Sequence, residues 1–408
     1  MNDRPTGPAA DQPSDRPTGP AAGELSDRAT GPVPGTAPAA PAATAATAAT
    51  AAPVMVAARV EVCGEAPVVA GCPLPVAGGG REVVRVLAAP ITPLDLLCAT
   101  GASYFGTPAV PYVPGVQGVG TVGGRLVWFP TAAGMAAGDG SMAELAPARA
   151  EELVELPAGT DPFAMAALGL SAVAAYLALT WRGELADGEQ VLVLGGGGVV
   201  GQAAIQLARL AGARRVVAAA RSEDGMRRAR RAGADAVVPL GPVARAVPGR
   251  RIAPEADGGR AGAETVTDGG RAGAETVAGQ VEELARRLAA VCDGPVDLVL
   301  DPLFGVPAAA AARTLRNGGR LVNLGGSASE TCPLDSATLR SRSLRLLGYT
   351  NNELTREQRS AAITYVAQQS AAGRLRVEHE VVPLAQAADA WQRQAAGTTN
   401  GRIVLHTG

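Results

Sequence analysis

Three closely spaced glycines suggest the clearest chemistry in this sequence. Gly196, Gly198 and Gly201 have the G-x-G-x-x-G spacing, after four branched apolar residues at 191–194 and before apolar residues at helical intervals at 202–211. The pattern predicts a buried strand, a tight turn and a helix whose free N–H groups and positive dipole end point at one place. Such a turn binds phosphate, because glycines let the backbone approach an anion closely. A second strand predicted at 216–220 completes the setting of a dinucleotide site. The expected cofactor contacts are Gly196, Gly198, Val199, Val200 and Gly201.

The end of the second strand indicates which dinucleotide is bound. NAD-dependent proteins usually have Asp or Glu there, whereas NADP-dependent proteins supply Arg for the 2′-phosphate. Here Ala220 takes the place of the acid and Arg221 follows. Because Arg binds a phosphate through a charged fork, we predict NADPH as the cofactor, with Arg221 at its 2′-phosphate. Nearby Glu223 and Asp224 argue against this site. The alternative is that Arg221 is solvated, like the arginines of the next helix, Arg227, Arg228, Arg230 and Arg231.

The composition bounds the class of protein. A chain of 408 residues with 47% hydrophobic content has material for two domains. Its net charge of −2 gives no excess of positive charge to attract nucleic acid or an anionic membrane, so we expect neither partner. All 36 basic residues are Arg, which excludes Schiff-base chemistry on Lys. The five cysteines are scattered and the two histidines, His379 and His406, lie near the C-terminus. We therefore expect reduced thiols, a cytoplasmic location and no metal site.

The first half of the chain contains a tail, a β-rich region and a long apolar segment. Residues 1–53 repeat an Asp-Arg-Pro-Thr-Gly-Pro motif and are rich in Ala, Pro and Thr, which predicts a disordered tail. Met55, where the first strand-like segment opens, is a candidate start of the folded protein or of translation. Short β-type runs between Gly and Pro at 56–156 are typical of a mostly antiparallel, barrel-like domain. Residues 163–181 reach membrane-spanning length without a charge, but they are Ala-rich and lack a basic flank, so a buried helix is favoured.

Further strand–helix units follow the glycine turn. Strands are expected at 236–240, 296–300, 320–324 and 343–348, which predicts a doubly wound parallel sheet. Residues 241–279 contain a tandem duplication (257–266 and 268–277) and are Gly-rich and charged. We expect an inserted flexible loop there, before a helix from Gln280. Helices at 355–372 and 384–396 and strands at 376–382 and 402–405 complete the prediction.

The order of these motifs resembles the medium-chain dehydrogenase/reductase superfamily, and within it the zinc-free quinone oxidoreductase and enoyl reductase branch. The matching stretches include residues 93–95 (PLD), 111–122 (PYVPGVQGVGTV), 138–144 (GDGSMAE), 168–172 (LGLSA) and the glycine turn. They continue with residues 232–235 (AGAD), 296–302 (VDLVLDP) and 401–405 (GRIVL). The resemblance spans about residues 56–405 and leaves the tail and the insertion unmatched.

The resemblance implies an α/β fold with two domains. A GroES-like, mostly-β barrel domain is expected at 54–165 and 350–408. A Rossmann nucleotide-binding domain with a doubly wound parallel sheet is expected at 166–349. The resemblance also implies a cleft between the domains and a homodimer.

Three residues depart from the zinc-dependent members of the superfamily. By the resemblance, Thr92 replaces a ligand Cys, Val116 replaces a ligand His, and Ser171 lies near the third ligand. Zinc needs three or four deprotonated N, S or O ligands, which Thr, Val and Ser do not supply, so we expect no catalytic zinc. Without a Lewis acid, hydride transfer favours a quinone or an α,β-unsaturated carbonyl compound, because the charge spreads into a hydroquinone anion or an enolate.

The catalytic candidates follow from the same resemblance. Thr92, Asp95 and Tyr104 lie in or beside the segment that offers Asn, Asp and Tyr to the nicotinamide and substrate in quinone oxidoreductases. For Asp95, a helix cap or turn is an equal alternative. For Tyr104, packing at the edge of the cleft is the favoured alternative.

The remaining cofactor candidates lie elsewhere in the sequence. Ser171 is expected near the nicotinamide by its position in the resemblance. Gly325 and Gly326 follow the fifth strand, where ligands bind beyond the carboxyl ends of parallel strands, so they are expected to let the backbone approach the ring. Arg402 is a candidate for the cofactor phosphates, with a surface position as the default.

Three functions remain open from the sequence. The favoured one is an NADPH-dependent reductase of quinones or α,β-unsaturated carbonyl compounds. The second is a zinc-independent carbonyl reductase or alcohol dehydrogenase that uses Tyr104 or Ser171 as proton donor. The third is a non-catalytic NADP(H)-binding sensor or accessory protein that uses the tail or the insertion as a contact.

Overall fold

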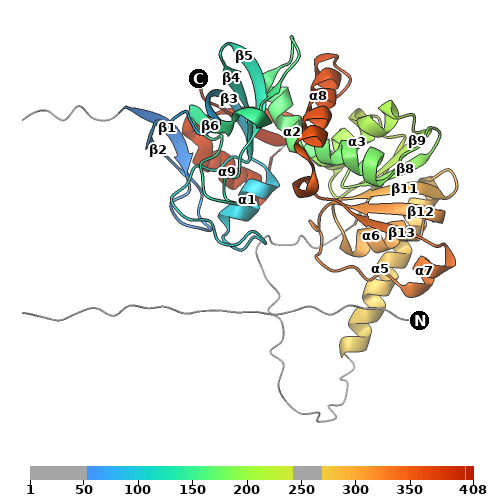
Figure 1. The fold of residues 1–408 in the computed structure, drawn as a ribbon. Helices are drawn as coiled ribbons and strands as arrows, with labels where there is room; N and C mark the ends of the chain where they lie inside the picture. The colour runs from blue at the N-terminus through green and yellow to red at the C-terminus, as the bar shows by residue number, and fades with distance from the viewer. Residues whose placement is uncertain (1–52, 242–268, 400) are drawn as a thin grey trace, which may run out of the picture. The chain divides into compact units, whose positions relative to one another are not determined.

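In the computed structural model, which describes residues 53–241, 269–399 and 401–408, strand β8 (Gln190–Leu194) lies at the centre of a parallel sheet. All side chains of β8 are buried, because both faces of the strand are covered. Over the described residues the sheet has six strands in the order β10-β9-β8-β11-β12-β13, and all neighbours are parallel (Figure 1). The other strands are β9 (Arg215–Ala220), β10 (Ala236–Pro239), β11 (Val296–Asp301), β12 (Leu315–Asn323) and β13 (Arg345–Gly348). The order reverses at β8, so ligands are expected beyond the carboxyl ends of β8 and β11.

Helices cover both faces of the parallel sheet. Val191 and Val193 of β8 belong to a hydrophobic cluster with helix α3 (Val199–Leu210). Leu192 and Leu194 belong to another cluster, with helices α5 (Gly269–Val291) and α6 (Gly305–Ala312). Helices α4 (Glu223–Arg231) and α7 (Ser336–Ser341) complete this part of the chain. Successive side chains of a strand point to opposite faces, so this division confirms the predicted doubly wound α/β fold.

A second sheet is built from strands that precede and follow the parallel sheet in sequence. Over the described residues its order is β14-β15-β3-β4-β5-β7, with β6 paired to β3, and only β14 and β15 are parallel neighbours. Gly123 and Gly124 join β4 to β5 with φ of 55° and 80°, as a tight hairpin turn requires. The strands are β3 (Arg81–Pro90), β4 (Gln117–Val122), β5 (Arg125–Pro130), β6 (Leu145–Arg149), β7 (Val154–Glu155), β14 (His379–Pro383) and β15 (Arg402–His406).

Shorter elements pack against this second sheet. Strands β1 (Val54–Arg59) and β2 (Val68–Pro73) form an antiparallel hairpin, and helices α1 (Pro93–Ala99) and α9 (Ala387–Ala396) lie nearby (Figure 1). Three single turns complete this half: η1 (Ala150–Glu152), η3 (Asn351–Glu353) and η4 (Leu384–Gln386). The strands of each sheet fall within the two predicted domain ranges. The domain boundaries themselves remain predictions.

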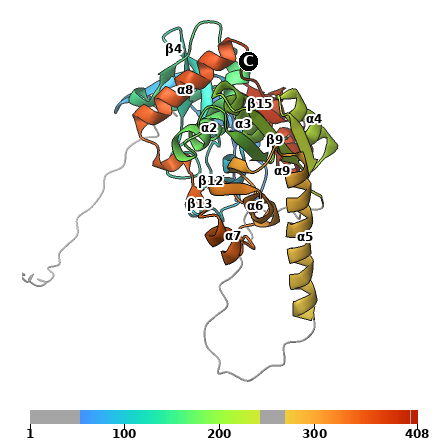
Figure 2. The same cartoon turned by 90° about the vertical axis from the view of Figure 1, so that its right-hand side faces the viewer.

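Helix α2 (Pro162–Leu177) connects the two halves and is the apolar segment singled out in the sequence. It packs beside α3 and α8 (Arg356–Ala371) and continues as a π-helical turn, η2 (Ala178–Arg182) (Figure 2). By length and composition alone, Pro162–Arg182 could cross a membrane, but 61% of its most apolar window is buried inside the protein. Gly169, at φ 31° and ψ −133°, kinks the helix. This packing matches the expected buried helix.

The inserted segment differs from its prediction at one end. Helix α5 begins at Gly269, within the second copy of the duplication, so the expectation of a loop is wrong for residues 269–279. The physical reason is cooperativity: residues 281–288 pack Val281, Leu284 and Leu288 in the core, and adding Ala and Glu residues to an existing helix costs little. The predicted tail and the rest of the predicted loop, residues 1–52 and 242–268, lie outside the described residues.

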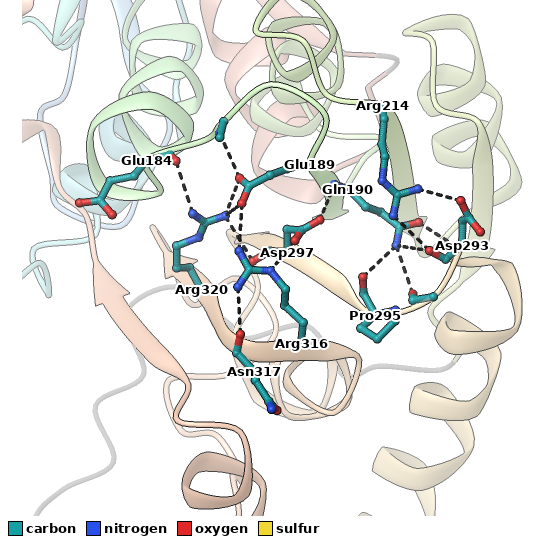
Figure 3. Close-up of polar contacts among 12 residues, drawn as sticks. Glu184, Glu189, Gln190, Arg214, Asp293, Pro295, Asp297, Arg316, Asn317 and Arg320 are labelled. Atoms are coloured by element: carbon teal, nitrogen blue, oxygen red, sulfur yellow. Dashed lines mark hydrogen bonds and ion pairs between the residues drawn. The ribbon is translucent and has the colours of Figure 1, made fainter.

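A buried charge network joins the strands of the parallel sheet at the end away from the glycine turn (Figure 3). The Nη2 atom of Arg320 lies 2.5 Å from both carboxylate oxygens of Glu189, and both side chains are largely buried. Arg316 adds contacts of 3.2 Å to Glu189 and 2.5 Å to Asp297. Asp297 also accepts a hydrogen bond of 2.7 Å from the backbone of Gln190. The network therefore ties β8, β11 and β12 together.

Candidate functional site

Helix α3 begins at the glycine turn without a side-chain cap. Its N-cap is Gly198, so no side-chain oxygen accepts hydrogen bonds from the first N–H groups of the helix. The first N–H groups of an α-helix have no partner within the helix, and they carry the positive end of its dipole. The N–H groups of Val199, Val200 and Gly201 are therefore available to an anion. By contrast, helices α1, α2, α4 and α8 have accepting N-cap side chains, on Thr92, Asp161, Ser222 and Thr355.

The glycines of the turn have different physical roles. A Cβ atom at Gly196 would collide with Ala218 of β9, and one at Gly201 would collide with the backbone of Gly195. Packing therefore requires glycine at these two positions. A Cβ atom at Gly198 would have the carbonyl oxygen of Gly195, at 3.4 Å, as its nearest protein neighbour. The space in front of Gly198 is open, which fits the approach of a phosphate.

Arg402, at the start of β15, is buried, which corrects the surface position expected by default. The side chain is 4% exposed; Nη1 donates to the carbonyl oxygen of Ile91 and Nη2 to Oγ of Ser171, both at 2.9 Å. The Nε atom is buried without a hydrogen-bond partner among the described residues. Burial lowers the pKa of Arg402 to about 10, and the charge of Asp95 opposes that shift. A buried cation with neutral hydrogen-bond partners is costly, and a bound anion would offset the cost.

A short series of hydrogen bonds links Arg402 to the glycine turn. The backbone N–H of Arg402 donates to the carbonyl oxygen of Glu378 at 3.0 Å. The backbone N–H of Glu378 donates to Oε1 of Gln202, in the first turn of α3, at 3.2 Å. Gln202 donates through Nε2 to the carbonyl oxygen of Gly197 at 3.1 Å. These bonds connect the backbone of Arg402 to the first turn of α3, while its guanidinium is bonded to Ile91 and Ser171.

The kink in α2 sets the position of Ser171. A Cβ atom at Gly169 would collide with the side chain of Gln117 on β4. Oε1 of Gln117 accepts a hydrogen bond of 2.9 Å from the backbone N–H of Leu170, which belongs to the interrupted part of the helix. Ser171 follows directly and presents its hydroxyl to Arg402. Gln117 was not among the predicted site residues, although an amide side chain in a mostly apolar strand is a signal for a buried polar contact.

Thr92 and Asp95 form a capping box at the start of α1. The Oδ2 atom of Asp95 accepts from the backbone N–H and the hydroxyl of Thr92, at 2.8 and 2.6 Å. Its Oδ1 atom accepts from the backbone N–H groups of Gly115 and Val116, at 3.1 and 2.8 Å. Burial raises the pKa of Asp95, opposed by the hydrogen bonds from Thr92 and Val116 and by the charge of Arg402. With both oxygens occupied, Asp95 holds two segments together, which supports the cap alternative.

Tyr104 lies outside this cluster. Its side chain is 72% exposed, its ring lies against Phe105 with the centroids 4.3 Å apart, and its hydroxyl is 3.4 Å from Nδ2 of Asn352. The neighbouring Asn351 donates to the carbonyl oxygen of Leu170 at 3.1 Å. Tyr104 is thus near the kink of α2 but at the surface, as the packing alternative expects.

Gly325 and Gly326 follow β12 at the carboxyl edge of the parallel sheet. Nδ2 of Asn323 donates to Oδ2 of Asp301 and to the carbonyl oxygen of Gly325, both at 2.9 Å, and so joins the ends of β11 and β12. Burial raises the pKa of Asp301, and the hydrogen bond from Asn323 opposes this. The two glycines therefore lie at the edge where the sequence analysis expects the nicotinamide.

The side chains at Thr92, Val116 and Ser171, where a ligand set for zinc was considered, are poor ligands for a metal ion. The Thr92 hydroxyl is engaged with Asp95, Val116 has no donor atom in its side chain, and the Ser171 hydroxyl accepts from Arg402. In the part of the chain that the structure describes, no group of three or more His, Cys, Asp and Glu side chains could hold a metal ion. This set of donors does not fit zinc.

Arg221 lies one residue beyond β9 and is exposed. It forms no ion pair with the described residues.

Arg228 differs from the solvated arginines among which it was expected. Its side chain is half-buried, and its Nε atom donates to the carbonyl oxygen of Gly197 at 2.9 Å.

Comparisons with known proteins find relatives in sequence and in fold. A family model described as "Zinc-binding dehydrogenase" matches residues 262–405. The quinone oxidoreductase of Pongo abelii is 31% identical over 160 residues, which cover 38% of this chain and 48% of that protein. The chain thus spans about half the length of the curated relatives that it matches.

Solved structures cover more of the chain. The quinone oxidoreductase from Thermus thermophilus, described alone and in complex with NADPH, is 27% identical, with a TM-score of 0.66 over 86% of this chain and 100% of that one. A structure described as an NAD-dependent alcohol dehydrogenase is 24% identical, with a TM-score of 0.67 over 87% of this chain and 100% of its own, which shows a likeness of fold.

Proposed function

We propose that this chain is a member of the medium-chain dehydrogenase/reductase superfamily and acts as an NADPH-dependent, zinc-independent oxidoreductase. The proposed acceptors of the hydride are quinones and α,β-unsaturated carbonyl compounds.

The proposal depends most on the uncapped start of α3 and on the buried Arg402, which hydrogen bonds through Glu378 and Gln202 connect. The N–H groups of Val199 to Gly201 have no side-chain cap, and the guanidinium of Arg402 is buried with an unpaired Nε. The backbone of Glu378 bonds to the backbone of Arg402 and to the side chain of Gln202 on α3. The uncapped N–H groups and the guanidinium both favour the same kind of ligand, an anion such as a pyrophosphate. Because the two features come from different sheets, the geometry supports a dinucleotide bound along the line where the sheets meet.

Different residues of the described chain would bind the pyrophosphate and the nicotinamide of NADPH. The N–H groups at the start of α3 would hold the pyrophosphate, and Arg402 would add positive charge beside it. Gly325 and Gly326 would allow the backbone to approach the nicotinamide, with Ser171 nearby. When bound, NADPH supplies the hydride, and the protein supplies orientation and an electrostatic field.

The proposed substrate class rests on the side chains at Thr92, Val116 and Ser171, which are poor ligands for zinc. Thr92, Val116 and Ser171 do not fit zinc, so no step depends on a metal ion. A hydride acceptor must then spread its negative charge, as a quinone or an enone does. The Ser171 hydroxyl accepts a hydrogen bond from Arg402, so its own hydrogen is available to an oxygen of the substrate or of the nicotinamide amide.

An assay panel tests this function. NADPH and NADH oxidation would be followed by the absorbance of the reduced nicotinamide ring with a quinone, an enone and a saturated aldehyde, each with and without a chelator. We expect turnover of the quinone or enone with NADPH, unaffected by the chelator. A saturated aldehyde as the best substrate would favour the carbonyl reductase alternative, and loss of activity on chelation would overturn zinc independence. Nucleotide binding without turnover would favour the sensor or accessory protein.

The homodimer and the cytoplasmic location belong to the same proposal. Strand β13 is an edge strand over the described residues, and Leu346 on it is 43% exposed, which supports contact with a second copy. Light scattering after size-exclusion chromatography tests this, and a monomer at micromolar concentration would contradict it.

A further inference from the structure

A surface hollow lies between helix α4 and the residue that precedes β14. Its volume is ≈ 280 Å³, and its lining residues are Asp224, Arg227, Arg228, Arg231 and Glu378. Three guanidinium groups and two carboxylates thus share one small space. Their pairing decides which charge remains for a ligand.

Two of the three arginines are already paired with the carboxylates of the hollow. Arg227 forms an ion pair with Asp224 one turn away on α4, and Nη2 of Arg231 lies 3.2 Å from Oε1 of Glu378. Arg228 forms no ion pair with any described residue. Its Nε atom donates to the carbonyl oxygen of Gly197, and both terminal nitrogens of its guanidinium remain for another partner. Arg228 therefore carries the unbalanced charge of the hollow.

The surroundings of Arg228 favour an anion. Burial lowers the pKa of Arg228, the carboxylate of Glu378 opposes this, and the charges of Arg231 and Arg227 lower the pKa further. A guanidinium that is partly desolvated and faces like charges gains free energy when an anion binds. A terminal phosphate can accept two parallel hydrogen bonds from such a group.

The hollow adjoins the cofactor turn. Arg228 is bonded to Gly197, one residue before the N-cap of α3, and Gly197 and Gly225 of α4 are so close that a Cβ atom on Gly197 would collide. On the other side of the hollow, the backbone N–H of Glu378 donates to Gln202, in the first turn of α3. An anion in the hollow would thus lie beside a pyrophosphate bound at α3, on the α4 side where the ribose of the adenosine is expected.

We propose that this hollow binds the 2′-phosphate of NADPH, with Arg228 as the central ligand and Arg227 and Arg231 beside it. The inference rests on the proposed function and replaces Arg221 as the residue that distinguishes NADPH from NADH. Asp224 and Glu378 neutralise Arg227 and Arg231 in the empty hollow, and they oppose the phosphate when it enters. They therefore limit the preference for NADPH.

The experiment compares nucleotide binding by variants of the full chain. Dissociation constants for NADPH and NADH would be measured by fluorescence titration for the wild type and for R228Q, R231Q, E378Q, R221A and R230Q. Arg230 is the matched control, because it is an exposed arginine on the same helix that does not line the hollow. Circular dichroism and thermal unfolding check that each variant is folded, and R231Q tests the hollow without touching the turn.

We expect R228Q to weaken NADPH binding by about tenfold or more and NADH binding by much less, because the lost contact is a charged hydrogen bond to a phosphate. R231Q should act in the same direction with a smaller effect, and E378Q should strengthen NADPH binding by up to about fivefold. R221A and R230Q should leave the ratio of the two constants unchanged.

Three results would overturn the inference. They are equal loss of NADPH and NADH binding in both R228Q and R231Q, a loss of preference in R221A alone, and a wild type that binds both nucleotides equally. Adenosine 2′,5′-bisphosphate and AMP separate this inference from the proposed function, because they cannot transfer hydride. If the bisphosphate binds more tightly than AMP and R228Q removes the difference, the hollow is supported even if no substrate is reduced.

Discussion

The side chain of Gln117 accepts a hydrogen bond of 2.9 Å from the backbone N–H of Leu170, 53 residues further along the chain. The same oxygen accepts from Nε1 of Trp128 at 3.0 Å. A helix interior leaves no N–H group for an outside partner, so this bond exists only because α2 is kinked at Gly169. One amide on a strand of the second sheet thereby fixes the bend that places Ser171 against Arg402.

Replacing Gln117 by Leu should destabilise the protein by roughly 2–4 kcal/mol, because the buried donor of Trp128 and the part-buried N–H of Leu170 lose their acceptor. The free energy of unfolding in urea measures this. Gln368 on α8 is exposed, so Q368L is a matched control with an expected effect within about 0.5 kcal/mol. Equal effects of the two variants would contradict the role of Gln117.

Replacing Arg320 by Leu should cost roughly 3–5 kcal/mol, because it leaves Glu189 buried beside a single remaining cation, Arg316. The exposed pair of Arg345 and Glu184 is the control, since R345L should cost at most about 1 kcal/mol. Urea unfolding of both variants provides the comparison. Because the network lies away from the glycine turn, the folded R320L protein should keep the nucleotide affinity of the wild type. A large loss of affinity in the folded protein would contradict this separation.

Replacing Arg402 by Met should weaken binding of both NADPH and NADH by about tenfold or more, since each has the same pyrophosphate. Equal weakening distinguishes Arg402 from Arg228, whose loss should affect NADPH selectively. Fluorescence titration with both nucleotides gives the ratio. Unchanged affinity in a folded R402M protein would remove Arg402 from the cofactor site.

Stability should fall between pH 9 and pH 11. Burial raises the pKa values of Cys98, Cys292 and Cys332 from 9.0 to about 11, so the folded protein holds these thiol protons more tightly than the unfolded chain. Their contribution is complete below pH 9, where both states are protonated, and is lost as the pH rises towards 11 and the unfolded thiols ionise first. Urea unfolding under reducing conditions at pH 8, 9, 10 and 11 should show this decline.

The variant C292A/C332A is the control for that decline. Its free energy of unfolding should fall less steeply between pH 9 and pH 10 than that of the wild type, because it lacks two of the thiols whose pKa values are raised by burial. The same slope in both proteins would assign the alkaline instability to other groups, such as Tyr112 and Tyr349, whose pKa values burial also raises.

The periodic parts of the chain were predictable, and the contacts between distant segments were not. The branched apolar run before Gly196 is fully buried in β8, and Arg402 does begin the closing strand. The interpretation of Arg402 as a surface residue was wrong, because sequence pattern assigns charge to solvent unless a partner is known. The loop predicted at 269–279 failed for a related reason, since its helix depends on residues packed further along in α5.

By itself the sequence determined the α/β fold, the glycine turn with its uncapped helix, and the poor metal-binding chemistry of the side chains at Thr92, Val116 and Ser171, because these depend on residue type and on spacing along the chain. Only the tertiary structure decided that Asp95 has both oxygens occupied, that Gln117 holds the kink of α2, that Arg228 bonds to the glycine turn, and that Arg402 is buried against Ser171. The physical reason is that burial and hydrogen bonding are set by segments that are dozens to hundreds of residues apart, and local patterns carry no record of which of them meet.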